Sequence, residues 1–210
     1  MIPGYDLLHR LAGTILAAEL GEKASVLVVG AGTGMEIVEW GRSHPGWRFT
    51  GVDPSAPMLA QAQEKVEKAG LSGRVTLKAG TLEQLPEDED FDAAALLLVL
   101  HFVPDNGEKA DLLCSIAERL KPGAPFLLAT RFGDPESTRF KKMLAFSKAW
   151  TLAQGMDSEE AEKRFSPART DLHDVPEERV KILLREAGLI DVQRFYQGFL
   201  IGAWLARKPK

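Results

Sequence analysis

Residues 26–34 read VLVVGAGTG, an apolar run that leads directly into glycines at every second position. A strand that enters a helix through glycines leaves backbone N–H groups free and lets a ligand approach the chain closely. The dinucleotide-binding pattern G-x-G-x-x-G would place its third glycine at Met35, but here the glycines are Gly30, Gly32 and Gly34. The stretch predicts a buried strand followed by a ligand-binding loop. Its spacing weakens, without excluding, the case for a dinucleotide enzyme.

The overall composition is that of an ordinary globular domain. The chain has 210 residues, 45% of them hydrophobic, and a formal net charge of −4. We expect one domain over residues 1–210, no disulfide because Cys114 is the single cysteine, and no nucleic-acid partner because no broad basic field is present. Early charged residues such as Asp6 and Arg10 argue against a signal peptide, and no apolar run is long enough to cross a membrane. We expect a cytoplasmic protein, and a homodimer is compatible with these features.

Strand and helix patterns alternate along most of the chain. Apolar runs bounded by glycine or proline predict strands, and apolar residues at helical spacing predict helices. This alternation predicts a parallel sheet with helices on both faces, the α/β class. Strands are expected within residues 25–30, 47–55, 74–80, 91–103 and 124–131, and helices over residues 5–20, 35–44, 57–70, 106–123 and 176–189.

The last part of the chain departs from this alternation. DVQRFYQ (191–197) and FLIGAWLAR (199–207) are separated only by Gly198. A parallel crossover needs about a dozen residues or more, so these two strands must pair antiparallel. We therefore predict a Rossmann-like, mostly parallel seven-stranded sheet with a reversed terminal strand.

Residues 132–175 form a second departure, because they contain two helical patterns where the alternation requires one. An insertion that follows a strand of an open α/β sheet lies over the binding crevice at the carboxyl ends of the strands. We predict a small helical insertion within the domain that acts as a lid. The alternative is a helical pair that merely extends the core.

Asp53 ends the second expected strand, where the ribose-binding carboxylate stands in nucleotide-binding folds of this class. One carboxylate can accept hydrogen bonds from two hydroxyl groups, which suits a ribose diol. The alternative is a turn or helix-capping aspartate in the sequence DPS. Its position at the strand end favours the ligand-binding role.

Five segments in order resemble the successive motifs of class I S-adenosylmethionine-dependent methyltransferases. They are VLVVGAGTG, GVDPSAPMLAQA, AGTLEQLP, FDAAALLLVLHFVPD and LKPGAPFLLA, and together they extend over about residues 25–131. The resemblance implies S-adenosylmethionine as cofactor and a small-molecule methyl acceptor. It also implies a cofactor-binding set from several strand ends, namely Gly30, Ala31, Gly32 and Gly34 near the methionine part, Asp53 at the ribose, Met58, Gly80, Thr81 and Leu82 around the adenine, and Leu100 beside the methionine part.

Two positions depart from that family's pattern. Thr81 stands where an aspartate often contacts the adenine, so a hydroxyl, the backbone or water would have to replace it. Val28 stands where an acidic residue often precedes the first glycine by two positions. Indirect support for the amino group of the cofactor is therefore missing or comes from elsewhere in the chain.

The two ends of the chain resemble a more specialised family of the same fold. IPGYDLL (2–8) and FYQGFLIGAWLA (195–206) are similar to the ends of carboxy-S-adenosylmethionine synthases. That resemblance implies conversion of the cofactor's methyl group to a carboxymethyl group, using prephenate, for tRNA wobble-uridine modification. The family places an arginine for the extra carboxylate where this chain has Leu183. We therefore prefer ordinary methyl transfer, with the carboxylating enzyme and a non-catalytic cofactor-binding module as alternatives.

Four side chains are candidates for catalytic contact with the acceptor. His101 follows the fourth strand, where a general base is useful, although a supporting role is the alternative. Arg131 ends the fifth strand and would bind an acidic substrate or form a surface salt bridge. Tyr5 would reach the pocket or anchor the first helix, and Tyr196 would face the pocket from the last strands. The histidines show no metal-ligand spacing, so we expect no metal.

Overall fold

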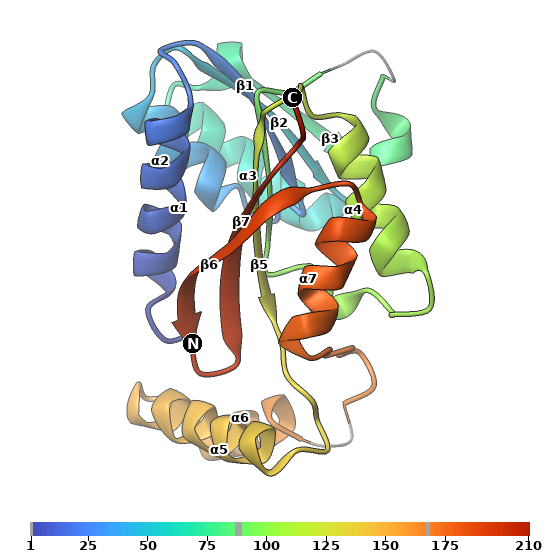
Figure 1. Cartoon of the computed structure of the whole chain (residues 1–210). Helices are drawn as coiled ribbons and strands as arrows, with labels where there is room; N and C mark the ends of the chain where they lie inside the picture. Colours follow the sequence, from blue (N-terminus) through green and yellow to red (C-terminus); the bar gives the residue numbers. More distant parts are fainter. Residues whose placement is uncertain (1, 87–89, 167–168) are drawn as a thin grey trace.

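The structure is a computed structural model that describes residues 2–86, 90–166 and 169–210. In this part of the chain seven strands form one sheet in the order β3-β2-β1-β4-β5-β7-β6 (Figure 1). All neighbouring pairs are parallel except the two that involve β7, so the predicted reversed terminal strand is confirmed. The strands are β1 (Ala24–Val29), β2 (Trp47–Asp53), β3 (Val75–Ala79), β4 (Ala93–Leu97), β5 (Pro125–Arg131), β6 (Ile190–Gly198) and β7 (Ile201–Arg207).

Helices cover both faces of the sheet, as the alternation predicts. Buried residues of α1, α2 and α3 share one apolar cluster with one face, and those of α4 and α7 share a second cluster with the other. Every residue of β4 is buried, which explains why it reads as a continuous apolar run. The bounds are α1 (Tyr5–Glu19), α2 (Met35–Ser43), α3 (Ala56–Lys68), α4 (Glu108–Glu118), α7 (Glu177–Glu186), and the short 3₁₀ helices η1 (Ser72–Arg74), η2 (Leu82–Gln84) and η3 (Leu100–Phe102).

The connection from β1 to α2 depends on glycine. Gly30 has a φ of 69°, in the left-handed region that glycine adopts without steric cost. A Cβ atom at this position would lie 2.2 Å from Cγ2 of Val99, in the loop after β4. Because the residue at position 30 has no side chain, the chain can turn here from strand to helix. The same lack of a side chain lets the loops after β1 and β4 lie in close contact.

The two predicted helices of the 132–175 segment are α5 (Thr138–Ala153) and α6 (Ser158–Arg164). They lie across the end of the sheet to which β5 runs, below the strands in Figure 1. Along α5 only Phe140 and Thr151 are buried, and along α6 only Ala161. The insertion is therefore a thin layer over the carboxyl ends of the strands.

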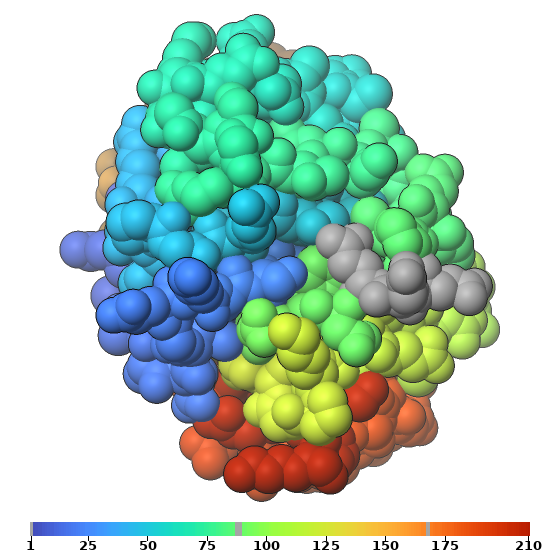
Figure 2. Space-filling view, turned by 90° about the horizontal axis from the view of Figure 1, so that it is seen from above, coloured from blue at the N-terminus to red at the C-terminus, as the bar shows by residue number. Residues whose placement is uncertain are grey.

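Figure 2 shows the molecule from above, with most of the insertion hidden behind the rest of the chain.

No helix in the described part of the chain combines the length and apolar character needed to cross a membrane. The same residues contain no group of three histidine, cysteine or acidic side chains arranged to hold a metal ion.

Candidate active site

A cavity of about 390 Å³ opens where the loop after β1 meets the ends of β2 and β4. We call it the cofactor cavity. Five of the residues predicted to bind cofactor line it, and so does Tyr5, which was predicted as an acceptor contact. Those five are Gly30, Ala31, Gly32, Asp53 and Met58. The structure thus brings the glycine loop and the strand-end carboxylate to one hollow.

Asp53 is held in place by two backbone groups. Its Oδ2 accepts a hydrogen bond from the N–H of Gly32 at 2.8 Å, and its Oδ1 accepts one from the N–H of Ser55 at 2.8 Å. The carboxylate therefore ties the glycine loop to the turn after β2, while Ser55 caps α3 through the N–H of Met58. Each carboxylate oxygen has a further lone pair, so Asp53 can also accept hydrogen bonds from a ligand.

Glu36 is a cavity residue that the sequence analysis missed. It lies in the first turn of α2, lines the cofactor cavity and is almost fully buried. Burial raises the pKa of its carboxyl to about 7, and nearby Glu39 adds to the rise. Its Oε1 is 3.1 Å from Nε2 of His9, on α1, whose ring lies against that of Tyr5. The cavity thus holds a carboxyl group that burial poises between its neutral and ionised forms.

Other residues predicted to bind cofactor do not line the cavity. Gly34 caps α2 and packs against Ala62, and Leu82 is buried in the core. Gly80 and Thr81 lie beside the end of β2, where the N–H of Gly80 donates to the carbonyl of Asp53 at 2.9 Å. Leu100 is likewise buried in the core, because η3 turns its side chain inward, away from the place the sequence analysis gave it.

A second cavity, of about 130 Å³, lies between the end of β5, the insertion and the start of the chain. We call it the acceptor cavity. Phe102 lines both cavities, so they adjoin at this side chain. His101 and Arg131, two of the predicted acceptor contacts, line the acceptor cavity. Its other lining residues are Ile2, Pro3, Leu144, Ser147, Arg164, Phe165, Arg169, Leu172, Gly198, Leu200 and Ile201.

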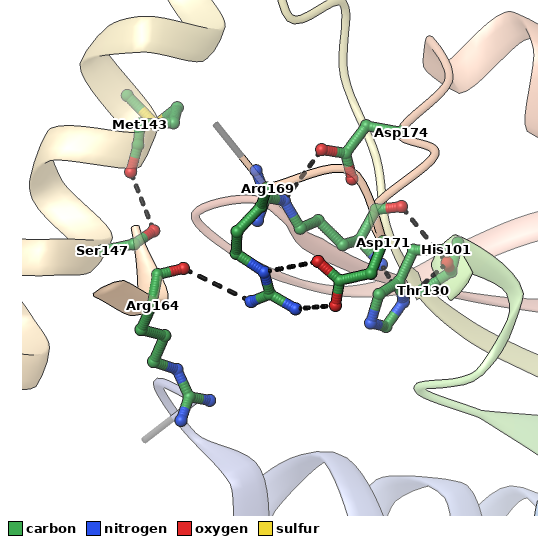
Figure 3. A network of polar contacts seen from close by, with 9 residues as sticks. His101, Thr130, Met143, Ser147, Arg164, Arg169, Asp171 and Asp174 are labelled. Carbon is green, nitrogen blue, oxygen red and sulfur yellow. Dashed lines mark hydrogen bonds and ion pairs between the residues drawn. The ribbon is translucent and has the colours of Figure 1, made fainter. Parts of the chain in front are cut away.

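The ring of His101 is buried and neutral. The backbone N–H of Arg131 donates to Nδ1 at 3.3 Å, and Oγ1 of Thr130 lies 3.2 Å from the same nitrogen (Figure 3). Burial, reinforced by Arg131 and Lys109, lowers the pKa of His101 to about 3. Because Nδ1 accepts a backbone hydrogen bond, the proton of the neutral ring is on Nε2. His101 is therefore arranged to donate a hydrogen bond rather than to act as a strong base.

The guanidinium of Arg131 already has an anionic partner. Its Nε lies 3.0 Å from Oδ2 of Asp174, and both side chains are largely buried. The guanidinium also lies over the ring of Phe140, with Cζ 5.3 Å from the ring centroid. Arg131 was predicted to bind an acidic substrate or to form a surface salt bridge, whereas its salt bridge with Asp174 is largely buried. It joins the end of β5 to the segment that follows the insertion.

Tyr196 does not take the place predicted for it, because it is not among the residues that line either cavity. Its hydroxyl donates to the carbonyl of Pro3, which does line the acceptor cavity. Tyr196 therefore fixes the start of the chain rather than facing an acceptor. Leu183, the position at which carboxy-S-adenosylmethionine synthases have arginine, is fully buried in the core.

Comparisons with known proteins bear on the family and the fold. Residues 26–123 match the family described as "Methyltransferase domain". The chain is 26% identical over 211 residues to the ubiquinone/menaquinone biosynthesis C-methyltransferase UbiE of Geobacter sulfurreducens, with 94% of this chain and 80% of that protein covered. It is 23% identical over 207 residues to the carboxy-S-adenosyl-L-methionine synthase of Campylobacter hominis, with coverage of 99% and 87%.

A solved structure shares the fold over nearly the whole chain. It is the 1,6-didemethyltoxoflavin-N1-methyltransferase of Burkholderia thailandensis with bound 1,6-didemethyltoxoflavin and S-adenosylhomocysteine. The TM-score is 0.65 at 23% identity, and the match covers 96% of this chain and 78% of that one. The matched domain, the relatives along the full length and the fold lead to one assignment. These findings together support a class I S-adenosylmethionine-dependent methyltransferase, an enzyme with S-adenosylmethionine as cofactor.

Proposed function

We propose that the chain binds S-adenosylmethionine in the cofactor cavity and transfers its methyl group to a small molecule in the acceptor cavity. The observation that carries this proposal is Phe102, which lines both cavities and marks where donor and acceptor would meet. The related methyltransferases named above act on small molecules, which supports an acceptor of this size. At about 130 Å³, the acceptor cavity suits a compact ligand.

The residues present fit the cofactor. A Cβ atom at Gly32 would lie 3.1 Å from Cε of Met58, so the glycine keeps open a narrow slot beside that side chain. Asp53 would accept hydrogen bonds from the ribose hydroxyls. Glu36 would face the amino group of the methionine part and so replace the acidic residue that is absent at Val28. A carboxylate in the first turn of a helix is also favoured by the helix dipole.

Held by the glycine loop, Asp53 and Glu36, the cofactor would supply a methyl group on a sulfonium. The electron pair of the carbon–sulfur bond would stay on sulfur as a lone pair of the acceptor forms the new bond. The main contribution of the protein is alignment of the acceptor. His101 would donate its Nε2 hydrogen bond to the acceptor. The lowered pKa of His101 argues against general-base catalysis by this ring, so an acceptor proton would pass to solvent.

The insertion would act as the lid of the acceptor cavity. Leu144 and Ser147 of α5 and Arg164 of α6 contribute directly to its wall. Because few residues of these helices are buried, their displacement would expose little core. Such a layer can open for acceptor exchange at low cost in folding free energy.

The proposal is tested in two stages. Native mass spectrometry of the purified protein and calorimetric titration with S-adenosylhomocysteine establish whether the cofactor binds; Asp53→Asn is expected to weaken binding roughly tenfold or more. Turnover is then followed with S-adenosylmethionine that carries a deuterated methyl group and pools of small metabolites. Absence of cofactor binding by the wild-type protein would overturn the proposal. Recovery of a carboxylated cofactor would favour the carboxylating alternative.

A further inference from the structure

The polar lining of the acceptor cavity is dominated by arginine. Three arginines, Arg131, Arg164 and Arg169, are among its lining residues, and among the described residues no acidic one lines it. Two of them pair with a carboxylate that is not among the lining residues. Arg131 is paired with Asp174, and Arg169 makes a two-pronged contact with Asp171 in which its Nε donates to Oδ1 at 2.8 Å (Figure 3).

Arg164 is different from the other two. Its carbonyl accepts a hydrogen bond from Arg169 at 3.3 Å, but in the described part of the chain its guanidinium has no ion pair. In Figure 3 this guanidinium lies apart from the two aspartates. It also lines a neighbouring groove that contains Asp6 and Arg10, and no ion pair joins Asp6 to it among the described residues. Among the described residues, Arg164 is therefore the lining arginine without a carboxylate partner, and its side chain is exposed.

An uncompensated guanidinium beside a partly enclosed cavity attracts an anion. Its planar donors match a carboxylate in a bidentate arrangement, and because the Arg164 side chain is exposed, water screens part of the attraction. Ser147 adds a further polar group: its hydroxyl donates to the carbonyl of Met143, so its oxygen is left to accept a hydrogen bond. The rest of the wall is largely apolar, with Phe165 and Leu200 among its members.

We propose that the methyl acceptor is a small carboxylic acid whose carboxylate binds Arg164 of the insertion while its apolar body fills the cavity toward Phe102. This inference rests on the proposed function and names the substrate class of the same site. The charged end is held by the lid, and the reacting atom lies at the opposite end, nearest the cofactor cavity. Binding of the acid would therefore draw the insertion down over the acceptor.

The test uses the full chain saturated with S-adenosylhomocysteine. Benzoate, phenylacetate and 3-phenylpropionate are titrated against it, each beside its neutral primary amide, by ligand-observed NMR and calorimetry. At least one acid is expected to bind roughly three- to tenfold more tightly than its amide. Arg164→Gln is expected to abolish that preference and Arg164→Lys to restore part of it. Lys163→Gln, which removes an exposed charge from the same helix, is expected to keep it.

The outcomes separate the two proposals. If S-adenosylhomocysteine does not bind to the wild-type chain, the proposed function fails and the acceptor class fails with it. If S-adenosylhomocysteine binds equally well to wild type and to Arg164→Gln, the variant is folded. Two results would then overturn only the acceptor class: acids that bind no better than their amides, or a preference for acids that survives in Arg164→Gln. A carboxylated cofactor that co-purifies with wild type and is lost in Arg164→Gln would assign the carboxylate to the cofactor instead.

Discussion

The two cavities of this methyltransferase are built in different ways. The cofactor cavity is formed mainly by backbone turns at the ends of β1, β2 and β4, with Asp53 hydrogen-bonded to two backbone N–H groups. The acceptor cavity is formed mainly by side chains from η3, β5, the insertion and the start of the chain. One of its charged residues, Arg131, is held by an ion pair with Asp174, from a segment that is distant in sequence.

Because of this difference, the fold constrains the cofactor cavity, whereas the residues of the acceptor cavity can vary. A turn that depends on glycine tolerates few substitutions, so the loop can keep one cofactor through extensive changes elsewhere. A wall of side chains on a thin insertion can change without disturbing the core. The acceptor is therefore expected to follow from the insertion, and the cofactor from the strand ends.

The largest effect is expected from Gly30→Ala in the backbone-built cavity. The new Cβ would lie 2.2 Å from Val99, and the φ of 69° is itself unfavourable for alanine. We expect a loss of about 2–5 kcal/mol in the free energy of unfolding. A displaced loop should also weaken S-adenosylhomocysteine binding about a hundredfold. Urea unfolding and calorimetry measure the two effects.

Gly70→Ala provides a matched control for that substitution. Gly70 has nearly the same φ, 70°, but no atom lies within 4 Å of the added Cβ. It should cost only the conformational part, about 1 kcal/mol, and leave the affinity for cofactor unchanged. Equal losses in the two variants would show that backbone conformation alone, and not the contact with Val99, makes glycine necessary at position 30.

The next largest effect is expected from Asp174→Asn, which breaks the side-chain-built cavity. It leaves the guanidinium of Arg131 largely buried without its partner, so we expect a loss of about 3 kcal/mol in unfolding free energy. The affinity for S-adenosylhomocysteine should be unchanged, because the pair borders the other cavity. Asp171→Asn, at the exposed pair with Arg169, should leave the unfolding midpoint nearly unchanged.

A double variant sharpens this result. Replacement of both partners with apolar residues, Arg131→Met with Asp174→Leu, should recover most of the lost stability, because no unpaired charge remains. If Asp174→Asn unfolds at the wild-type urea concentration, the pair is solvated and the acceptor cavity does not depend on it. If Asp174→Asn also binds S-adenosylhomocysteine more weakly, the two cavities are energetically coupled.

The fold was predictable because its signals are local. Glycine-ended apolar runs marked the strands, and the short link at Gly198 required an antiparallel pair. The strand-end positions of the glycine loop and Asp53 placed them correctly at one edge of the sheet. Helix bounds were less accurate: the helix expected over residues 176–189 ends at Glu186, because Ala187 and Gly188 leave the helix before β6.

The acceptor cavity was only partly predictable because its residues meet through tertiary packing. His101 and Arg131 follow strands and were found, but Arg164 and Arg169 belong to a charged stretch with no distinguishing pattern. Lys109 reads as a solvent-exposed helix residue, yet it is buried and donates to the carbonyls of Leu100 and Val103 at 2.6 Å, holding η3 in place. Glu36 was missed for the same reason: it is buried in the folded chain, where its carboxylate meets His9 of α1.

The smallest effect is expected at Glu36, a side chain within the backbone-built cavity, and it depends on pH. Burial raises the pKa of this carboxyl to about 7. The cofactor's ammonium group should favour the ionised form, so S-adenosylhomocysteine affinity should rise roughly tenfold from about pH 6 to about pH 7.5. Burial raises the pKa of Tyr5 to about 12, so Tyr5 is neutral over this range, and burial lowers the pKa of His9, which favours its neutral form. Glu36→Gln should bind at the weaker level throughout.

Stability without cofactor should change in the opposite sense. A carboxyl whose folded pKa is raised binds a proton more readily in the folded chain, so its contribution to stability is lost as the pH rises from about 4.5 to about 7. Glu36→Gln should remove that slope from urea unfolding as well as the slope in affinity. Glu39→Gln, on the same helix, should keep both slopes but shift them to lower pH, because the charge of Glu39 helps to raise the pKa of Glu36. If the affinity keeps its pH dependence in Glu36→Gln, the cofactor's amino group is recognised by backbone groups alone. Cofactor binding would then depend on the glycine loop and Asp53.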